Sequence, residues 1–210
     1  MNIAYGSCVG SWDKLQANVI PRVVGRPLLG LSGQTQITVA YNTILDAYRG
    51  WHLDAVILLH DDLEITDPAA ETKFLDVLSD PDVAIVGVCG GRGDTTLSWW
   101  NSETIGHQAT DSGQLEFGPR TGDVAFIEGS IMVFSPWAVE HLRFDERYPG
   151  FLGYDDICLT AREAGKRVVV ADVDTHHHST LGFKSPAIAR AWDVAEEIFQ
   201  EKWFPVGRTS

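Results

Sequence analysis

The stretch AVILLHDDLEI (residues 55–65) decides how the rest of the chain is interpreted. The residues from Ala55 to Leu59 are apolar without alternation, which is typical of a strand covered on both faces in the centre of an α/β sheet. This run ends directly in His60, Asp61 and Asp62, three side chains that a buried strand excludes. Because ligands of open α/β sheets bind beyond the carboxyl ends of the strands, the stretch predicts a functional site there.

Strand and helix patterns alternate along the chain around this stretch. The expected strands cover residues 2–10, 55–59, 83–91, 124–135 and 167–173, and the expected helices cover 34–48, 66–80 with Asp67 as cap, a short segment from Ser135, 155–164 and 186–199. This alternation predicts an α/β fold with a mainly parallel sheet, flanked by helices on both faces. Residues 90–123 are rich in Gly, Thr, Ser and Asp, and we expect a functional loop there.

Length and composition narrow the possible classes of protein. The chain has 210 residues and is 44% hydrophobic, which suits a single domain spanning residues 1–210. The formal net charge of -13 argues against nucleic acid and anionic membranes as partners. Cys8, Cys89 and Cys158 have no CxxC spacing and are expected to be reduced. With no signal peptide pattern and no membrane-spanning apolar run, we expect a cytoplasmic protein.

The group His60-Asp61-Asp62 offers two carboxylates and an imidazole at one strand end. Carboxylates and imidazoles suit a divalent cation such as Mn²⁺ or Mg²⁺, and such ions bridge protein carboxylates to nucleotide phosphates. The alternative is that one aspartate caps the following turn while His60 bonds to the backbone.

Two later groups have similar chemistry. Asp155 and Asp156 lie at the start of an expected helix, where a carboxylate can act as a general base, although paired acids there are also ordinary capping residues. The stretch DVDTHHHST follows a buried strand; in an extended segment His176 and His178 point the same way, and His177 points to the other side. One of these imidazoles can complete the coordination of a cation, and the alternative is a solvated loop.

The order of these groups resembles the GT-A glycosyltransferases, specifically the family-2-like group. Residues 127–180 resemble the family pattern of a Gly-containing strand, FDE, an acidic motif written YDD here, an AG turn, a strand and a histidine. Residues 39–65 resemble the Asn-bearing helix that leads into the strand with the DxD motif. The resemblance covers about two thirds of the chain, and it departs from the pattern in having His60 at the first DxD position.

The resemblance implies a metal-dependent, inverting hexosyltransferase that moves a sugar from a nucleotide-diphosphate sugar to an acceptor hydroxyl. Residues 1–100 would bind the nucleotide sugar and the metal, and residues 101–210 would bind the acceptor and catalyse transfer. The acceptor, whether glycan, small molecule or protein, stays open, as do the sugar and the nucleotide.

The resemblance also implies roles for individual residues. Asp155 or Asp156 would be the base, and Asp62 with His176 or His178 would bind Mn²⁺ or Mg²⁺. The residues implied to line the donor and acceptor site are Ser7, Cys8, Asn42, His60, Asp61, Glu128 and Gly129. Trp99, Trp100 and Trp137 are candidates for stacking on sugar rings, with burial in the core as the alternative.

Two other functions fit the same residues. A different metal enzyme acting on phosphates, such as a nucleotidyltransferase or a hydrolase, would also place acids at strand ends. A nucleotide-sugar binding module without catalysis would keep the donor site and have no use for a base at Asp155 or Asp156.

Overall fold

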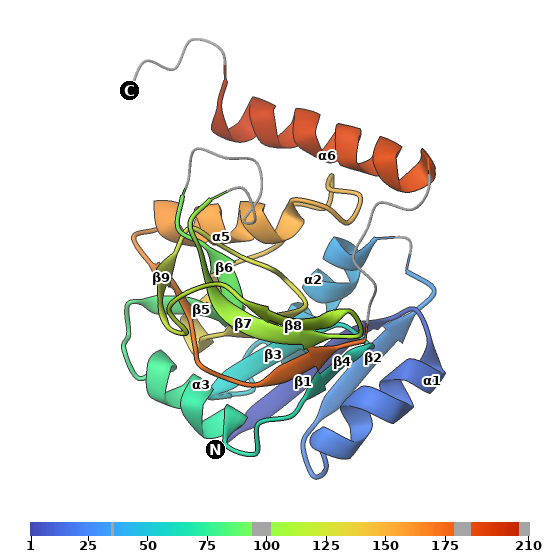
Figure 1. The fold of residues 1–210 in the computed structure, drawn as a ribbon, viewed down its shortest axis with the longest axis vertical. Coiled ribbons are helices and arrows are strands. Elements are labelled where there is room, and N and C mark those ends of the chain that lie inside the picture. The colour runs from blue at the N-terminus through green and yellow to red at the C-terminus, as the bar shows by residue number, and fades with distance from the viewer. Residues whose placement is uncertain (35, 94–101, 179–185, 206–210) are drawn as a thin grey trace.

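A computed structural model describes residues 1–34, 36–93, 102–178 and 186–205 (Figure 1). Trp99 and Trp100 lie outside the described residues. Seven strands form the main sheet, in the order β2-β1-β3-β11-β5-β12-β9. In chain order they are β1 (Ile3–Val9), β2 (Leu28–Ser32), β3 (Ala55–Leu59), β5 (Val83–Gly87), β9 (Gly122–Val124), β11 (Ile131–Phe134) and β12 (Arg167–Val170).

The main sheet is mixed in direction. Strands β2, β1 and β3 are parallel to one another, and so are β5 and β12. Strand β11 lies between these two groups and runs antiparallel to both β3 and β5, while β9 is antiparallel to β12. The α/β class is confirmed, with more antiparallel pairing than the expected alternation of strands and helices implied.

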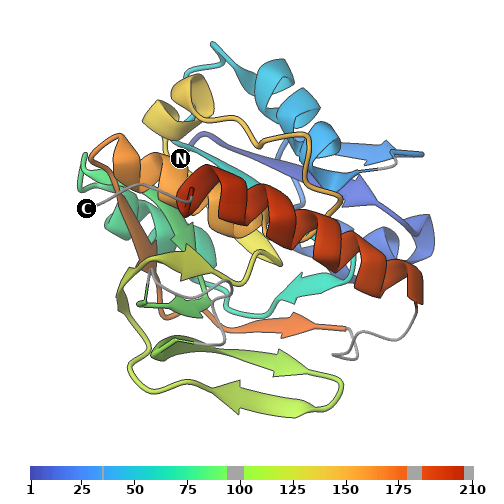
Figure 2. The ribbon, with the colours of Figure 1, turned by 90° about the horizontal axis from the view of Figure 1, so that it is seen from above.

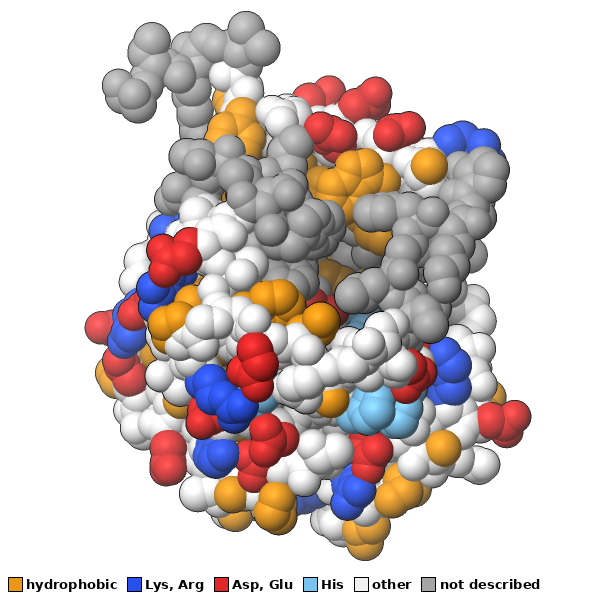
Figure 3. Space-filling view, in the orientation of Figure 1, with side chains coloured by type: hydrophobic (Ala, Val, Ile, Leu, Met, Phe, Trp, Pro, Cys, Tyr) orange, Lys and Arg blue, Asp and Glu red, His pale blue; other side chains and the backbone are white. Residues whose placement is uncertain are grey.

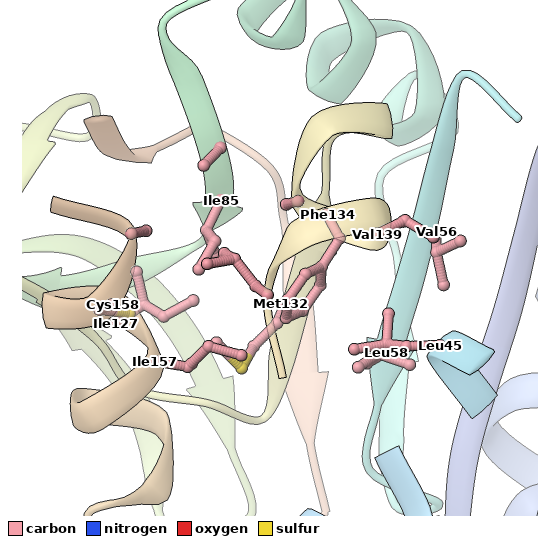
Figure 4. Packing of buried hydrophobic residues seen from close by; sticks show 14 of the residues in the cluster. Leu45, Val56, Leu58, Ile85, Ile127, Met132, Phe134, Val139, Ile157 and Cys158 are labelled. Carbon is pink, nitrogen blue, oxygen red and sulfur yellow. The ribbon is translucent and has the colours of Figure 1, made fainter. Parts of the chain in front are cut away.

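Strand β3 is buried on both faces, as its continuous apolar sequence predicts. Val56 and Leu58 belong to one core cluster, which also contains Leu45 and Phe134 (Figure 4). Ala55, Ile57 and Leu59 belong to the cluster on the opposite face, which is closed by residues of the π-helical turn Leu15–Val19 and of the helix Ala70–Leu78. Because both faces are packed, the strand is held rigidly up to His60.

Helices cover both faces of the main sheet. They are α1 (Trp12–Lys14), which continues into a π-helical turn (Leu15–Val19) and a 3₁₀ turn (Ile20–Arg22), then α2 (Ile37–Tyr48), α3 (Ala70–Leu78), α4 (Pro136–His141), α5 (Gly153–Glu163) and α6 (Pro186–Trp203). Helix α3 begins later than expected: Asp67 accepts the backbone N–H of Ala69 at 2.8 Å and so precedes the first turn. Helix α6 lies across α5 (Figures 1 and 2), with Phe199 packed in the same cluster as Leu159.

The expectation of a loop over residues 90–123 is wrong for the part that the structure describes. This segment supplies three of the six strands of a second sheet, which is ordered β10-β6-β7-β13-β4, with β8 paired to β7. Its strands are β4 (Leu63–Ile65), β6 (Cys89–Gly91), β7 (Thr104–Thr110), β8 (Gly113–Glu116), β10 (Phe126–Ile127) and β13 (Thr175–His177). Short strands rich in Gly and Thr have little apolar periodicity, so tertiary pairing determines them.

Two further expectations concern cysteines and membranes. The three cysteines are unpaired, with Cys89 and Cys158 buried and Cys8 partly exposed. Among the helices that the structure describes, none combines the length and the apolar character needed to cross a bilayer.

Candidate active site

Backbone hydrogen bonds bring the end of β3 together with two distant segments. The N–H of His60 donates to the carbonyl of Ser130 at 2.9 Å, and the N–H of His178 donates to the carbonyl of Asp62 at 2.8 Å. Strand β13 also pairs with β4, so that His177 is opposite Leu63. The chain thereby places the histidine stretch beside the polar end of β3.

Three side chains converge at this point, and we call His60, Asp62 and His177 the inner cluster. His177 Nε2 lies 3.2 Å from Asp62 Oδ1 and 3.4 Å from His60 Nδ1. One ligand atom from each residue lies within 4.8 Å of the others, a spacing that suits a shared metal ion. The sequence brings these atoms together from positions more than a hundred residues apart.

The second nitrogen of each inner histidine has its own neighbour. His60 Nε2 lies 2.9 Å from the hydroxyl of Tyr154, and His177 Nδ1 lies 3.8 Å from Glu128 Oε1. If Nε2–H of His60 donates to Tyr154, the Nδ1 lone pair points into the cluster. Partners of this kind select the tautomer and the orientation of metal-binding histidines.

The charges of the inner cluster are set by burial and by close partners. Burial would raise the pKa of Asp62, but hydrogen bonds from His177 and Lys14 outweigh it and hold that pKa well below its usual range. Burial and the nearby His177 lower the pKa of His60. Burial opposes protonation of His177, but its contacts with Asp62 and Glu128 raise its pKa on balance. An ionised carboxylate and a neutral imidazole are the forms that bind metals.

This donor set fits a divalent transition ion. Two imidazole nitrogens and one carboxylate favour Mn²⁺ and similar ions over Mg²⁺, which prefers oxygen ligands throughout. The inner cluster leaves further coordination positions for water or a ligand oxygen, because three protein groups converge there among the residues that the structure describes. The residues present therefore fit the expected cation, with Mn²⁺ the better match of the two ions considered.

Asp61 faces away from the inner cluster and organises the end of β1. Its Oδ2 accepts the backbone N–H groups of Gly10 at 2.8 Å and Ser11 at 2.6 Å. Charge-assisted bonds of this kind are strong, so they fix the turn between β1 and α1. The same turn leads to Lys14, whose Nζ lies 3.0 Å from Asp62 Oδ2.

The other residues expected around β1 and α2 are Ser7, Cys8 and Asn42, and they differ in their contacts. Ser7 is buried, and its hydroxyl has no hydrogen-bond partner among the described residues. Cys8 follows it, with a thiol pKa raised by burial and by Asp61. Asn42 binds the segment after α4: its Nδ2 donates to the carbonyl of Phe144 and to Glu146, both at 2.9 Å. Asn42 thus fixes the position of the FDE segment, residues 144–146.

Glu128 and Gly129 lie between β10 and β11. Glu128 Oε2 accepts the N–H of Ser130 at 2.8 Å, which leaves Oε1 near His177. Gly129 has a φ of +97°, and a Cβ at this position would lie 2.3 Å from the ring of Tyr154. A glycine is required here because the tyrosine ring packs directly on the backbone.

The metal site expected from the sequence needed the side chain of His176 or His178 beside that of Asp62, and the structure groups both histidine side chains with Asp111 instead. The two rings do share a face, stacked with centroids 4.0 Å apart, but that face is turned toward Asp111 and Glu64. The physical reason is the register of β13 with its neighbours, which points His177 inward. We call Asp111, His176 and His178 the outer cluster.

Asp155 and Asp156 lie in the first turn of α5 and differ sharply in their contacts. Asp155 is 5% exposed, its Oδ1 has no hydrogen-bond partner among the described residues, and burial raises its pKa to about 8. Asp156 Oδ1 accepts hydrogen bonds from Trp203 Nε1 at 2.8 Å and Tyr148 at 3.2 Å, and its carboxylate forms an ion pair with Lys202. These contacts favour an anchoring role for Asp156.

Four site residues were not expected from the sequence: Lys14, Asp111, Tyr154 and, as an inner ligand, His177. Tyr154 stood next to the two candidate acids, and alternation along a strand already separated His177 from its neighbours. Trp137, a candidate for sugar stacking, instead stacks on His141 with ring centroids 4.9 Å apart on α4. Lys14 and Asp111 carry no sequence signal, because each reaches its cluster through tertiary packing.

Comparison with known proteins gives similarity in structure alone. No family model matches the chain, and no curated protein matches it in sequence. The solved structure of A197 from STIV aligns with a TM-score of 0.61 at 12% identity, covering 86% of this chain and 87% of that one. GalNAc-T7, solved with UDP, GalNAc and Mn²⁺, aligns with a TM-score of 0.60 at 10% identity over 97% of this chain.

The chain has the GT-A fold. It spans about half of GalNAc-T7, since the alignment covers 52% of that chain. A glycosyltransferase involved in glycosylation of the PBCV-1 major capsid aligns with a TM-score of 0.47 at 14% identity, covering 93% of this chain and 100% of that one. The GT-A fold agrees with the resemblance seen in the sequence, and its β3 end carries the inner cluster.

Proposed function

We propose that this GT-A chain is a metal-dependent glycosyltransferase that moves a sugar from a nucleotide-diphosphate sugar to an acceptor hydroxyl, with inversion. The convergence of His60, Asp62 and His177 at the carboxyl end of β3 carries the proposal. In a fold of this kind, that edge of the sheet is where ligands bind. The fold of the chain supports the proposal independently of the cluster.

The donor would bind between the end of β1 and the inner cluster. A divalent cation held by the inner cluster would neutralise the negative charge that develops on the departing diphosphate. Lys14 contributes a second positive charge, held beside Asp62 and half exposed to solvent. The turn at Gly10 and Ser11, fixed by Asp61, shapes the wall of the site next to β1. Residues 1–100 thus supply most of the proposed donor site.

Asp155 is the proposed general base. Its carboxyl is buried, and Oδ1 has no hydrogen-bond partner among the described residues, so this oxygen would take the proton of an acceptor hydroxyl that reaches it. A raised pKa makes the ionised carboxylate a stronger base, and with a pKa of about 8 the ionised form becomes the major one above that pH. As Asp155 takes the proton, the acceptor oxygen would bond to the anomeric carbon on one face of the sugar while the bond to the diphosphate breaks on the opposite face, which gives inversion. Residues 101–210 thus supply the proposed base and acceptor site.

A thermal-shift screen of nucleotide-diphosphate sugars, each with and without Mn²⁺, tests donor binding. We expect one donor to stabilise the protein only when Mn²⁺ is present, because the ion links its diphosphate to the inner cluster. His177→Ala should remove this stabilisation, and His178→Ala, its neighbour on the other face of β13, should retain it. Stabilisation by the donor alone, or loss in both variants alike, would contradict the proposed inner site.

Product analysis separates transfer from the two alternative functions. With the identified donor and a panel of glycan, small-molecule and protein acceptors, we expect nucleoside diphosphate to be released in step with the glycosylated product. Release of nucleoside monophosphate or pyrophosphate would indicate a different phosphate enzyme. Donor binding with no turnover, unchanged in Asp155→Asn, would indicate a binding module.

A further inference from the structure

The outer cluster, Asp111, His176 and His178, lies on the face of β13 opposite the inner cluster. His176 Nε2 lies 3.1 Å from Asp111 Oδ1, and His178 Nδ1 lies 3.3 Å from the same oxygen. Two ring nitrogens from different residues therefore converge on one carboxylate oxygen. Figure 3 shows exposed histidine side chains on this face, with acidic and basic side chains around them.

These separations match the spacing of ligands around a small cation. In a tetrahedral zinc site with bonds of about 2.0–2.1 Å, neighbouring ligand atoms are about 3.3 Å apart. His176 and His178 lie on the same side, because residues two apart in an extended segment point the same way. Their rings are stacked with an interplanar angle of 12°, so one ring would have to rotate before both nitrogens could direct their in-plane lone pairs at one ion.

The position of Asp111 is built into the fold. It occupies the turn between β7 and β8, where Thr110 Oγ1 donates to the carbonyl of Gly113 at 3.0 Å and accepts the N–H of Ser112 at 3.2 Å. Strand β7 pairs with β13, so that Ala109 is opposite His176. The hairpin therefore presents Asp111 to the two histidines in a fixed place.

A further carboxylate stands behind His178. Glu64 Oε2 lies 3.4 Å from Nε2, the ring nitrogen of His178 that faces away from Asp111. Arg22 holds Glu64 in turn, with Nε donating to its Oε1 at 3.1 Å. A carboxylate on the outer nitrogen selects the tautomer whose Nδ1 lone pair is free for a metal. Metal-binding histidines commonly have a carboxylate partner of this kind on the nitrogen that does not bind the ion.

We propose that the outer cluster is a second metal site, which binds Zn²⁺ or a similar divalent transition ion through Asp111, His176 and His178. Two imidazoles and one carboxylate suit Zn²⁺, and water would complete the tetrahedron because the three side chains are about one third to one half exposed. The site is separate from the proposed donor site and goes beyond the proposed function. Strand β13 would then hold an ion on each face.

Metal titration of the full-length chain, stripped with a chelator, tests this site. Co²⁺ is the probe, because its visible absorption bands report tetrahedral coordination, and Zn²⁺ is then added in competition. The key variant is His176→Ala with His178→Ala; both residues lie near the surface, so the fold is expected to persist, as checked by circular dichroism. His141→Ala removes a different exposed histidine and serves as the matched control.

The Asp62→Ala background makes the outer site distinguishable from the inner one. In that background we expect one ion to bind with tetrahedral Co²⁺ bands that Zn²⁺ displaces. The double histidine variant should raise its Kd by at least about 100-fold, since two of its three protein ligands are gone, and Asp111→Asn should weaken it as well. His141→Ala should leave it unchanged.

Two results would overturn the outer site. One is an Asp62→Ala protein that binds no Co²⁺, and the other is binding that the double histidine variant leaves unaltered. Failure of the inner site alone, seen as a wild-type protein that binds a single ion through His176 and His178, would leave the outer site supported and count against the proposed transferase chemistry.

Discussion

The chain contains two pairs of adjacent aspartates, Asp61-Asp62 and Asp155-Asp156. In each pair one aspartate binds a neighbouring segment of the fold, and the other is a proposed site residue. Asp61 binds the backbone of Gly10 and Ser11, whereas Asp62 turns toward His177. In the other pair the order is reversed: Asp156 anchors α6, and Asp155 Oδ1 has no hydrogen-bond partner in the part of the chain that the structure describes.

The comparison shows that two aspartates adjacent in the sequence have different surroundings in the fold. A strand end and a helix start both turn successive side chains in different directions, so only one member of each pair can face a given site. The member that binds backbone or a neighbouring helix stabilises the fold, and the other stays available. Substitutions within each pair should therefore separate function from stability.

The largest expected effect is the loss of transfer activity when Asp62 is substituted. Asp62→Ala removes the one carboxylate of the inner cluster, and we expect the transfer rate to fall by about 1,000-fold, since metal stabilisation of the leaving group contributes several kcal/mol. Asp61→Asn, which keeps an oxygen for Gly10 and Ser11, is the matched control and should stay within tenfold of wild type. Similar losses in the two variants would remove the distinction between them.

The second pair should divide in the same way under kinetic measurement. Asp155→Asn removes the proposed base, and we expect kcat to fall by about 100-fold or more with donor binding retained. In wild type, kcat/KM should rise with pH and level off above about 8, where Asp155 is ionised. Asp156→Asn should retain most of the activity. A larger loss in Asp156→Asn would assign the base to that residue.

Substitution of Asp156 should lower the free energy of unfolding more than substitution of Asp155, which is the reverse of their expected order in activity. Asp156→Ala leaves Trp203 Nε1 and Lys202 without their acceptor, and we expect the free energy of unfolding to fall by about 2–3 kcal/mol. Urea unfolding followed by circular dichroism measures this change. Asp155→Ala measured alongside should cost less, and an equal or greater cost would show that Asp155 also anchors the fold.

A smaller loss is expected for Asp61→Ala. The N–H groups of Gly10 and Ser11 lose their shared acceptor, but both residues lie near solvent and water can replace it in part. We expect a loss of about 1–2 kcal/mol in urea unfolding. Asp61→Asn should recover most of it, and if the asparagine variant is as unstable as the alanine variant, the negative charge itself is what the turn requires.

The last prediction concerns how stability changes with pH. Asp155 has a folded-state pKa of about 8 against 3.8 for an ordinary carboxyl, so between these values the folded state keeps a proton that the unfolded state releases. Its contribution to the free energy of unfolding therefore falls as pH rises through this window, by at most about 1.4 kcal/mol per pH unit, and stops changing above it. Asp155→Asn should gain stability relative to wild type over the same window. A constant difference between the two proteins from pH 5 to 8 would show that Asp155 is ionised in the fold.

The sequence predicted the main sheet better than the second one. The unbroken run from Ala55 to Leu59 indicates a strand packed on both faces, and packing on both faces is what the structure has. Strands β7 and β8 gave no such signal, because their residues are mostly small or polar, and β7 pairs with β13 through Ala109 and His176, which are 67 residues apart. Local pattern cannot report a partner so distant in the chain.

The same limit applies to the histidines. Alternation along a strand correctly placed His176 and His178 on one face. Which side of β13 faces Asp62 depends on the pairing of β13 with β4 and β7. A shift of this pairing by one residue would turn His176 and His178 toward Asp62 and His177 away from it. The roles of Asp155 and Asp156 were left open for a similar reason, since the position of α6 relative to α5 distinguishes them.

Gly129 has a consequence that reaches beyond its own position. The ring of Tyr154 occupies the space where a side chain at 129 would stand, and only from there does its hydroxyl meet His60 Nε2. A methyl group added at Gly129 would displace the ring, and His60 would be free to present its other nitrogen or to rotate. The orientation of the His60 imidazole toward the proposed cation thus depends on the absence of a side chain at position 129.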